Sequence, residues 1–257
     1  MIAGFTADRV ECWAVEGVGE VDSGDDLGAD LGPLLEAAGG LRPWDIVVVT
    51  HKIVSKAEGR VVQLEEVRPG AEAMALAARV EADPRLVEVI LGQSLRVVRA
   101  APGVLVTETR QGLVCANAGV DRSNVGGGEA VTCLPVDPDG SAARLRRAWL
   151  PLADGGPLGV VICDTFGRPF REGGVNVAVG LAGLPGLSDH RGVVDSHGYT
   201  LRASTLASAD EIAGLAELVM GKVAGRPVAI VRGLRWQGEG RGAGELQRQA
   251  ERDLFRQ

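Results

Sequence analysis

The sequence predicts an α/β protein in which mixed sheets are flanked by helices. Two short runs, Ile46–Val49 and Val160–Ile162, are continuously apolar, which is typical of strands buried on both faces. Segments with apolar residues at helical intervals lie between and after these runs. Three more segments of strand length follow one another directly between residues 95 and 119, so we expect antiparallel as well as parallel neighbours.

The first part of the chain alternates helices with strands. A short strand-like run is followed by a turn-rich acidic loop and by a helix over roughly 26–38. The strand at Ile46–Val49 leads into a loop or short helix that carries two lysines. Segments 70–82 and 85–92 have alanine- and leucine-rich helical spacing, and Pro84 suits the first position of the second helix because its φ is already helical.

The middle of the chain is predicted to be strands and a loop. Segments 95–100, 103–110 and 113–119 have strand length, and Arg110–Gly112 is expected to join the last two as a hairpin. Residues 126–140 are predicted to be a loop, which could mark a boundary inside the domain.

The last part again alternates. A helix is expected over 141–153, and the strand at Val160–Ile162 should end at Asp164. Ser208 and Glu211 have the spacing of a capping box, which predicts a helix from there to about Met220.

The end of the chain sets the expected domain limits. Residues 227–233 have the pattern of a final strand, and 237–257 form a polar, glycine-rich tail with little to bury. We therefore expect one domain over 1–236, with a possible subdivision near 126–140.

Composition excludes several classes of protein. The net charge of −7 opposes general nucleic-acid binding, because the phosphate backbone would be repelled over most of the surface. No signal peptide is recognisable and no apolar run approaches the roughly 20 residues of a membrane span, so a cytoplasmic protein without membrane contact is expected. The four cysteines show no CxxC pair, which favours buried free thiols over a metal or redox site.

The basic residues show one informative bias. Only Lys52, Lys56 and Lys222 are lysine among 27 basic residues, and all others are arginine. A coding bias accounts for the excess of arginine but not for the three positions that kept lysine. Because a compact ammonium fits sites that a planar guanidinium does not, these three lysines are candidates for contacts with phosphate.

Two aspartates follow predicted strands at the point where each should end. Asp121 comes after the strand at 113–119, and Asp164 comes after the second buried strand and before Thr165. Carboxylates and a hydroxyl in such places suit a hard divalent cation that also bridges substrate phosphates. Alternatively, both aspartates simply cap turns.

Lys52 and Lys56 are four residues apart, so one helical turn would point both in the same direction. Next to a strand end they could bind phosphates, and the alternative is a solvated helix face. The chain has neither GxxxxGK[ST] nor GxGxxG, which excludes a Walker P-loop and a dinucleotide fingerprint. It also lacks HExxH and GxSxG, and His190 and His197 are expected in loops or at the surface.

Several motifs together, in this order, resemble the coenzyme F420:L-glutamate ligase family. The resemblance covers about residues 10–235, and SKAEGR, NAGVDRSN and DTFGRPFR are its most specific parts. The motifs are VEGVGEVDSGDDL, VVVTHKIVSKAEGR, VCANAGVDRSNV, LPVDPDGSA, GVVICDTFGRPFREG, ADEIAGLAELVMG and PVAIVRGL.

The resemblance implies a fold and an activity. The family attaches L-glutamate to the deazaflavin coenzyme F420 precursor through γ-glutamyl links, using GTP with Mg²⁺ or Mn²⁺ and K⁺. Its members have a mixed α/β fold without a P-loop and are usually homodimers. Some relatives continue past a polar linker into a flavin-binding domain, so this chain is expected to be either a single-domain member or a truncated one.

The resemblance also assigns residues. Asp121, Asp164 and Thr165 match divalent-metal ligands, and further nucleotide contacts are expected after Met220, at Gly221 and Lys222. Lys222 replaces an acidic ligand of the family pattern; a lysine cannot coordinate a second cation, whereas its ammonium could take that cation's place near phosphate oxygens. The positions that match GTP contacts are Val18, Gly19, Glu20, Val21, His51, Lys52, Lys56 and Asn124.

The expected reaction activates a carboxylate as an acyl phosphate, which the amine of glutamate then attacks. Lys52 and Lys56 would stabilise the phosphates. Arg168 and Arg171 could clamp a substrate carboxylate or phosphate, or could form surface ion pairs instead. Two alternatives remain: an amide ligase of the same fold that uses a different acid, and a nucleotide-binding module without turnover.

Overall fold

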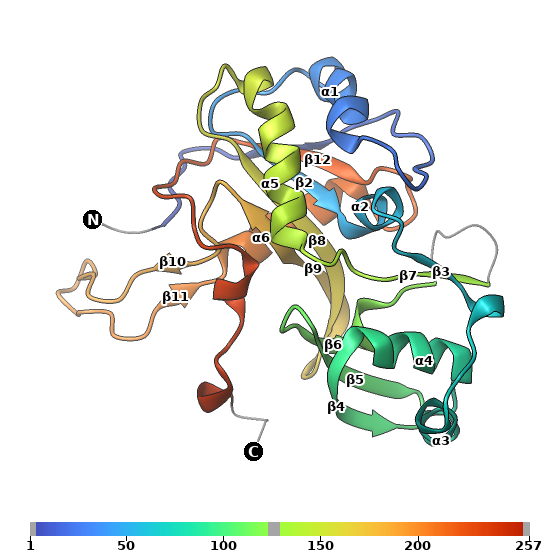
Figure 1. The fold of residues 1–257 in the computed structure, drawn as a ribbon. Helices are drawn as coiled ribbons and strands as arrows, with labels where there is room; N and C mark the ends of the chain where they lie inside the picture. Colours follow the sequence, from blue (N-terminus) through green and yellow to red (C-terminus); the bar gives the residue numbers. More distant parts are fainter. Residues whose placement is uncertain (1–3, 123–128, 254–257) are drawn as a thin grey trace.

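A computed structural model describes residues 4–122 and 129–253, which form a mixed α/β fold (Figure 1). The α-helices are α1 (Leu27–Ala37), α2 (His51–Ala57), α3 (Ala71–Val80), α4 (Pro84–Gln93), α5 (Pro138–Trp149) and α6 (Ser208–Met220). The strands are β1 (Glu11–Ala14), β2 (Ile46–Thr50), β3 (Val61–Gln63), β4 (Ser94–Ala101), β5 (Val104–Thr109), β6 (Val114–Ala116), β7 (Ala130–Thr132), β8 (Gly159–Arg168), β9 (Arg171–Ala182), β10 (Ser188–Asp189), β11 (Thr205–Leu206) and β12 (Val228–Arg232). Short 3₁₀ turns are η1 (Leu64–Glu66), η2 (Asn117–Gly119), η3 (Leu150–Ala153), η4 (Ala243–Leu246) and η5 (Ala250–Arg252).

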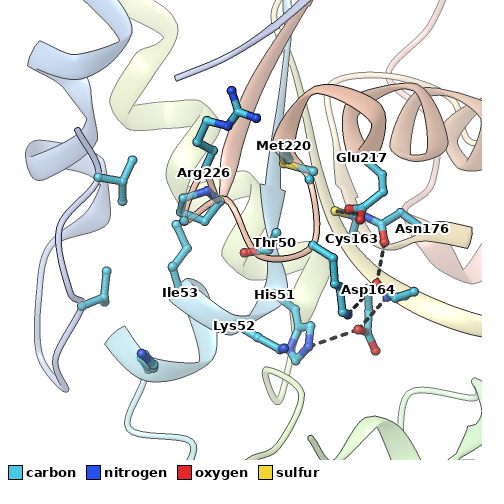
Figure 2. Close-up of a pocket in the computed structure, with 18 of the residues that line it drawn as sticks. Thr50, His51, Lys52, Ile53, Cys163, Asp164, Asn176, Glu217, Met220 and Arg226 are labelled. Atoms are coloured by element: carbon cyan, nitrogen blue, oxygen red, sulfur yellow. Dashed lines mark hydrogen bonds and ion pairs between the residues drawn. The ribbon is translucent and has the colours of Figure 1, made fainter. Parts of the chain in front are cut away.

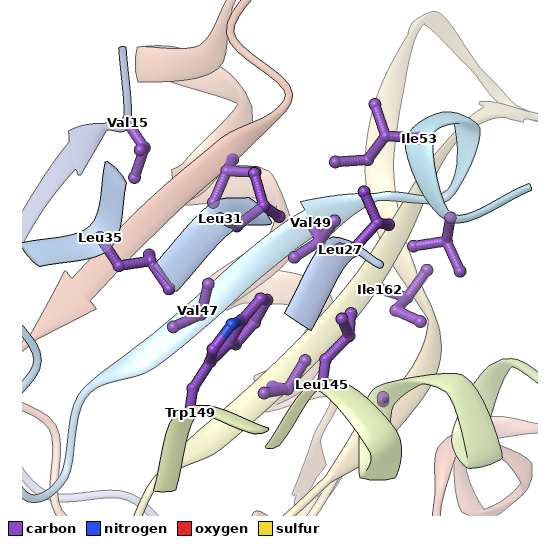
Figure 3. Packing of buried hydrophobic residues seen from close by; sticks show 14 of the residues in the cluster. Val15, Leu27, Leu31, Leu35, Val47, Val49, Ile53, Leu145, Trp149 and Ile162 are labelled. Carbon is purple, nitrogen blue, oxygen red and sulfur yellow. The ribbon is translucent and has the colours of Figure 1, made fainter. Parts of the chain in front are cut away.

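The main sheet has the order β1-β12-β2-β8-β9. Only β2 and β8 are parallel within it, and the other neighbours are antiparallel. Successive residues of a strand point to opposite faces. Val47 and Val49 therefore pack under α1 and α5, while Ile46 and Val48 pack under α6 (Figures 1 and 3). This double burial is the physical reason for the continuous apolar run in β2.

A second unit lies beside the main sheet. Helices α3 and α4 pack on the sheet β4-β5-β6, and β3 pairs with β7. This unit has its own apolar cluster, which includes Leu64, Ile90 and Val131. The expected subdivision near 126–140 remains a prediction, although this cluster is separate from the two clusters of the main sheet.

Several predicted elements are confirmed. Pro84 is the first residue of α4, and Asp83 caps that helix by accepting a hydrogen bond from Arg85 N. Strands β5 and β6 form the expected antiparallel pair. Of the cysteines, Cys115, Cys133 and Cys163 are buried free thiols, and Cys12 is partly buried.

The strand after Val160 was predicted to end at Asp164, and this was wrong. Strand β8 continues to Arg168 and forms a hairpin with β9, in which Asp164 lies opposite Val177 and Thr165 opposite Asn176. Cross-strand pairing therefore outweighs the polar character of these residues, which had suggested a loop.

Two predictions about loop and cap positions were also wrong. Within 126–140, residues Ala130–Thr132 form β7 because they pair with β3 and are buried. The capping box at Ser208 is not formed: the cap position of α6 is Ala207, and Ser208 Oγ lies 2.6 Å from Ser188 Oγ instead. The nearby Asp210 carboxylate accepts a hydrogen bond from Ala178 N at 2.9 Å, which satisfies a backbone donor of β9.

The polar tail buries more than its composition suggests. Ala243 in η4 is buried in the cluster beneath α6, and Glu245 accepts a hydrogen bond from Gly186 N. The limit at residue 236 between a domain and a tail remains a prediction. Among the described residues, no helix is both long and apolar enough to cross a bilayer.

One buried ion pair joins the start of β2 to the end of β12. Arg232 donates from Nε and Nη2 to the Asp45 carboxylate, at 2.8 and 2.6 Å. The Asp45 side chain is only 1% exposed, and hydrogen bonding to it raises the pKa of Arg232. The pair therefore fixes the position of the central strand against its neighbour.

We predict that Asp45→Ala lowers the free energy of unfolding by about 3 kcal/mol, because it leaves the Arg232 guanidinium unpaired and mostly buried. Urea denaturation would measure the change. The control is Asp189→Ala, which removes a similar arginine pair at an exposed position and should cost much less. Equal losses in the two variants would contradict the assignment.

Candidate functional site

A pocket of about 320 Å³ opens where β2 ends, beside the middle of β8 (Figure 2). Its walls come from the loop before α1, from α2, from the β8–β9 hairpin, and from α6 with the loop that follows it. The lining residues are Val18, Gly19, Glu20, Val21, Thr50, His51, Lys52, Ile53, Lys56, Cys163, Asp164, Thr165, Asn176, Glu217, Met220, Gly221, Lys222, Gly225, Arg226 and Pro227.

The parallel pairing of β2 and β8 places the first polar residues of the site. Thr50 lies opposite Cys163, so the residues that follow them, His51 and Asp164, emerge at the same edge of the sheet. Helix α2 begins immediately at His51. The two side chains therefore lie close together, although β8 does not end at Asp164.

All three lysines of the chain line this pocket. Lys52 Nζ is 2.7 Å from Asp121 Oδ2, and the Lys52 side chain is only 14% exposed. Lys56 pairs with Glu20, and its side chain is 11% exposed. Lys222 Nζ donates to Thr165 Oγ1 at 3.3 Å. Lysines spread over 170 positions of an arginine-rich sequence therefore meet at one cavity, which has the charge needed for a polyanionic ligand.

Two residues that the sequence did not single out complete the wall opposite α2. Asn176 is 2% exposed, donates to Glu217 Oε2 at 2.8 Å and accepts from the Thr165 hydroxyl at 2.7 Å. Figure 2 shows Asn176 and Glu217 on the same side of the pocket as Asp164. The available signals were weak: Asn176 is one of only three asparagines, and Glu217 interrupts the apolar pattern of α6.

His51, the first residue of α2, lies against the Asp164 carboxylate. The ring is 1% exposed, and its Nδ1 lies 3.3 Å from Ser55 Oγ one turn along α2. Its Nε2 lies 3.3 Å from Asp164 Oδ1 but makes no hydrogen bond of good geometry within the described residues. The same oxygen, Asp164 Oδ1, accepts a hydrogen bond from Thr165 N at 2.7 Å. One oxygen of the carboxylate is therefore held, and the Asp164 side chain lines the pocket.

Asp121 reaches the site from the second unit. The turn before it contains Asn117, Ala118 and Gly119 with φ of +53°, +55° and +69°, so three left-handed residues in a row lead the chain to Asp121. Asp121 then bonds to Thr132 through both backbone groups, and its side chain contacts Lys52. Asn124, the expected nucleotide contact three residues on, lies outside the described residues.

The oxygen donors fit a hard divalent cation, although they do not form a closed protein cage. The described residues contain no group of three or more acidic, histidine or cysteine side chains arranged around a metal position. Magnesium is commonly held by one or two carboxylates together with substrate phosphates. Asp164 and Thr165 line the pocket, whereas Asp121 contacts Lys52 and is not one of the lining residues. The Thr165 hydroxyl donates to Asn176 and accepts from Lys222, so Lys222 contacts one of the expected metal ligands.

Arg168 and Arg171 lie at the tip of the β8–β9 hairpin and are not part of the pocket wall. Arg168 Nε donates to Gly173 O at 3.1 Å, and its Nη2 donates to Glu172 O. Arg168 therefore stabilises its own turn. A role for either arginine in holding substrate stays a prediction.

The fold and the pocket define a mixed α/β protein in which lysines and carboxylates from four segments face one cavity. A family model described as F420-0:Gamma-glutamyl ligase matches residues 17–233. The chain belongs to this family.

Relatives in this family cover nearly the whole chain. A protein of Methanothermobacter thermautotrophicus named coenzyme F420:L-glutamate ligase is 47% identical over 94% of this chain and 97% of its own length. Proteins of the same name from Methanopyrus kandleri and Archaeoglobus fulgidus are 46% and 41% identical, over 89% and 96% of this chain and 92% and 97% of their own lengths. The resemblance found in the motifs is thereby confirmed.

We predict that Lys52→Met and Lys222→Met each weaken binding of inorganic triphosphate by about tenfold, because each removes a charged donor from the pocket. Titration calorimetry at fixed ionic strength would measure the affinities. Arg147→Met is the matched control, since Arg147 is an exposed cation on α5 outside the pocket. A similar loss in the control would attribute binding to overall charge rather than to this site.

Proposed function

We propose that this chain is a GTP-dependent amide ligase that joins L-glutamate to the carboxylate of the coenzyme F420 precursor F420-0, giving a γ-glutamyl link. The ligase family and its relatives support the substrates. The observation that carries the nucleotide part is the meeting of all three lysines with Asp164 in one pocket.

The chemistry needs an activated acid, because amide formation from a carboxylate and an amine is unfavourable in water. Transfer of the γ-phosphoryl group to the substrate carboxylate gives an acyl phosphate, and the glutamate amine then displaces phosphate. Lys52 and Lys222 stabilise the phosphate oxygens as negative charge shifts during transfer. Val18, Gly19 and Val21 would line the nucleotide, and Gly221 would let the loop with Lys222 approach it.

A divalent cation, Mg²⁺ or Mn²⁺, would bridge phosphate oxygens and neutralise their charge when bound. Asp164 and Asp121 are the residues that would hold it, with Thr165 beside them. His51 would keep the Asp164 carboxylate oriented. A requirement for K⁺ and a homodimeric state also belong to this proposal, since the family resemblance implies both.

The acceptor side of the site leaves one alternative open. Arg168 and Arg171, the expected carboxylate clamps, do not line the pocket, so the described pocket accounts for the nucleotide better than for the acid. A ligase of this fold that uses another acid would share the same pocket. Incubation with GTP, glutamate and a panel of acids, followed by mass spectrometry, separates the two, because only the true acceptor gains a glutamyl residue. GDP release that depends on the acid would exclude a nucleotide-binding module without turnover.

We predict that Asp164→Asn and Asp121→Asn each abolish glutamylation of F420-0 while the far-ultraviolet circular dichroism is unchanged. The Asp121 side chain is 32% exposed, and an amide oxygen at position 164 can still accept the hydrogen bond from Thr165 N, so the fold should be kept. Product formation by mass spectrometry is the measurement. Asp189→Ala, an aspartate outside the pocket, should keep full turnover. Full turnover in either pocket variant would refute the cation assignment.

We also predict that His51→Gln lowers the affinity for Mn²⁺ about tenfold or more, because removal of the group that orients a metal-binding carboxylate has this effect in other sites. Electron paramagnetic resonance of free Mn²⁺ would measure binding without any turnover. Ser55→Ala should cause a smaller loss, since Ser55 acts only through His51. If His51→Gln changes nucleotide affinity and leaves Mn²⁺ affinity unchanged, His51 is a nucleotide contact instead.

A further inference from the structure

We infer that the Lys56–Glu20 pair reads the guanine base of the nucleotide and makes this enzyme select GTP over ATP. The inference rests on the proposed function and adds the residues that recognise the base. It also changes the role of Lys56, which the sequence had suggested as a phosphate contact.

Lys56 and Lys52 point to different acids despite their common helix. The two residues are four apart on α2, so their backbones are about 6 Å apart along its axis. Lys52 pairs with Asp121 from the second unit, whereas Lys56 pairs with Glu20 from the loop before α1. Lys52 therefore belongs to the end of the pocket that holds Asp164, and Lys56 belongs to the other end.

The surroundings of the Lys56–Glu20 pair suit a flat ring. Ile53 is three residues before Lys56 and so lies on the same face of α2, and Val18 and Pro227 also line the pocket. Figure 2 shows Ile53 and Arg226 on the side away from Asp164, Asn176 and Glu217. Apolar walls with a few polar groups are the usual setting of a bound heterocycle.

The order of donor and acceptor in this pair matches guanine. The base presents O6 as an acceptor, next to the N1–H and N2–H donors. The Lys56 ammonium can donate to O6 while the Glu20 carboxylate accepts from N1–H and N2–H, so all three groups are satisfied at once. The Glu20 side chain is 75% exposed, so its carboxylate is accessible to a guanine base.

Adenine presents the opposite order at the same places. Its N6–H₂ group would meet the Lys56 ammonium, and its unprotonated N1 would meet the Glu20 carboxylate. Both contacts are unfavourable, and a site that leaves polar groups unpaired rejects the wrong ligand strongly. The pair therefore supplies selectivity by attraction and by repulsion.

The test is direct binding of GDP, IDP and ADP with Mg²⁺ by titration calorimetry. IDP differs from GDP only by lacking the 2-amino group. The wild-type chain should bind GDP at least tenfold more tightly than ADP, with IDP between them. Glu20→Ala should lower the affinity for GDP about 10- to 100-fold, the range for hydrogen bonds to a charged group, and make GDP and IDP bind alike.

Two further variants separate base from phosphate and from nonspecific charge. Lys56→Met should weaken GDP about tenfold and change inorganic triphosphate binding less than threefold, whereas a phosphate contact would weaken both. Glu239→Ala is the matched control, because Glu239 is 75% exposed like Glu20 and pairs with Arg146 outside the pocket, and it should leave the ratio of GDP to ADP affinity unchanged.

The outcomes distinguish the inference from the proposal on which it rests. If the wild-type chain binds no nucleotide, both the base-reading role of the pair and the proposed GTP-dependent activity are overturned. Binding without preference for GDP, or a preference that survives in Glu20→Ala, would overturn only the base-reading role of the pair. Loss of triphosphate binding in Lys56→Met would return Lys56 to the phosphate end.

Discussion

The parallel pairing of β2 with β8 is the constraint on which the site depends. Five consecutive pairs, from Ile46 opposite Gly159 to Thr50 opposite Cys163, fix the register of two strands that are buried on both faces. A shift by one residue would move every side chain of a strand into the opposite apolar layer, where different helices pack against it. Because both strands run in the same direction, the end of β2 at Thr50 lies beside Cys163 in the middle of β8. His51 and Asp164 therefore meet although they lie far apart in the sequence.

The core and the site obtain their order from different forces. Valine and isoleucine side chains pack the central strands under α1 and α5 on one face and under α6 on the other, and the Asp45–Arg232 ion pair joins β2 to β12. The charged groups at the pocket are then held pairwise, Lys52 by Asp121 and Lys56 by Glu20, so little charge is buried without compensation. An acidic protein can thus keep a local cationic site.

The sequence predicted the parts of this structure that follow from local pattern. The buried strands and the helices follow from apolar periodicity. Asp164 and the three lysines were also recognised, because their types are unusual in their surroundings. The β8 extension past Asp164 was missed because a polar strand is stabilised by its partner β9 and not by its own residues. Asn176 and Glu217 were missed for a similar reason: their role arises only when β9 and α6 are brought together.

The ion pairs of the pocket also connect ligand binding to charge exchange. Asp121 of the second unit and Lys52 of α2 neutralise each other's charge. If Asp121 binds a cation, it no longer pairs with Lys52. If Lys52 binds a phosphate, it no longer pairs with Asp121. Either exchange alone would leave one partly buried charge less well compensated, which is unfavourable. Exchange of both together keeps every charge paired, so cation and polyphosphate should bind cooperatively. The same two residues connect the main sheet to the second unit. Binding of both ligands would therefore change the contact between the two units.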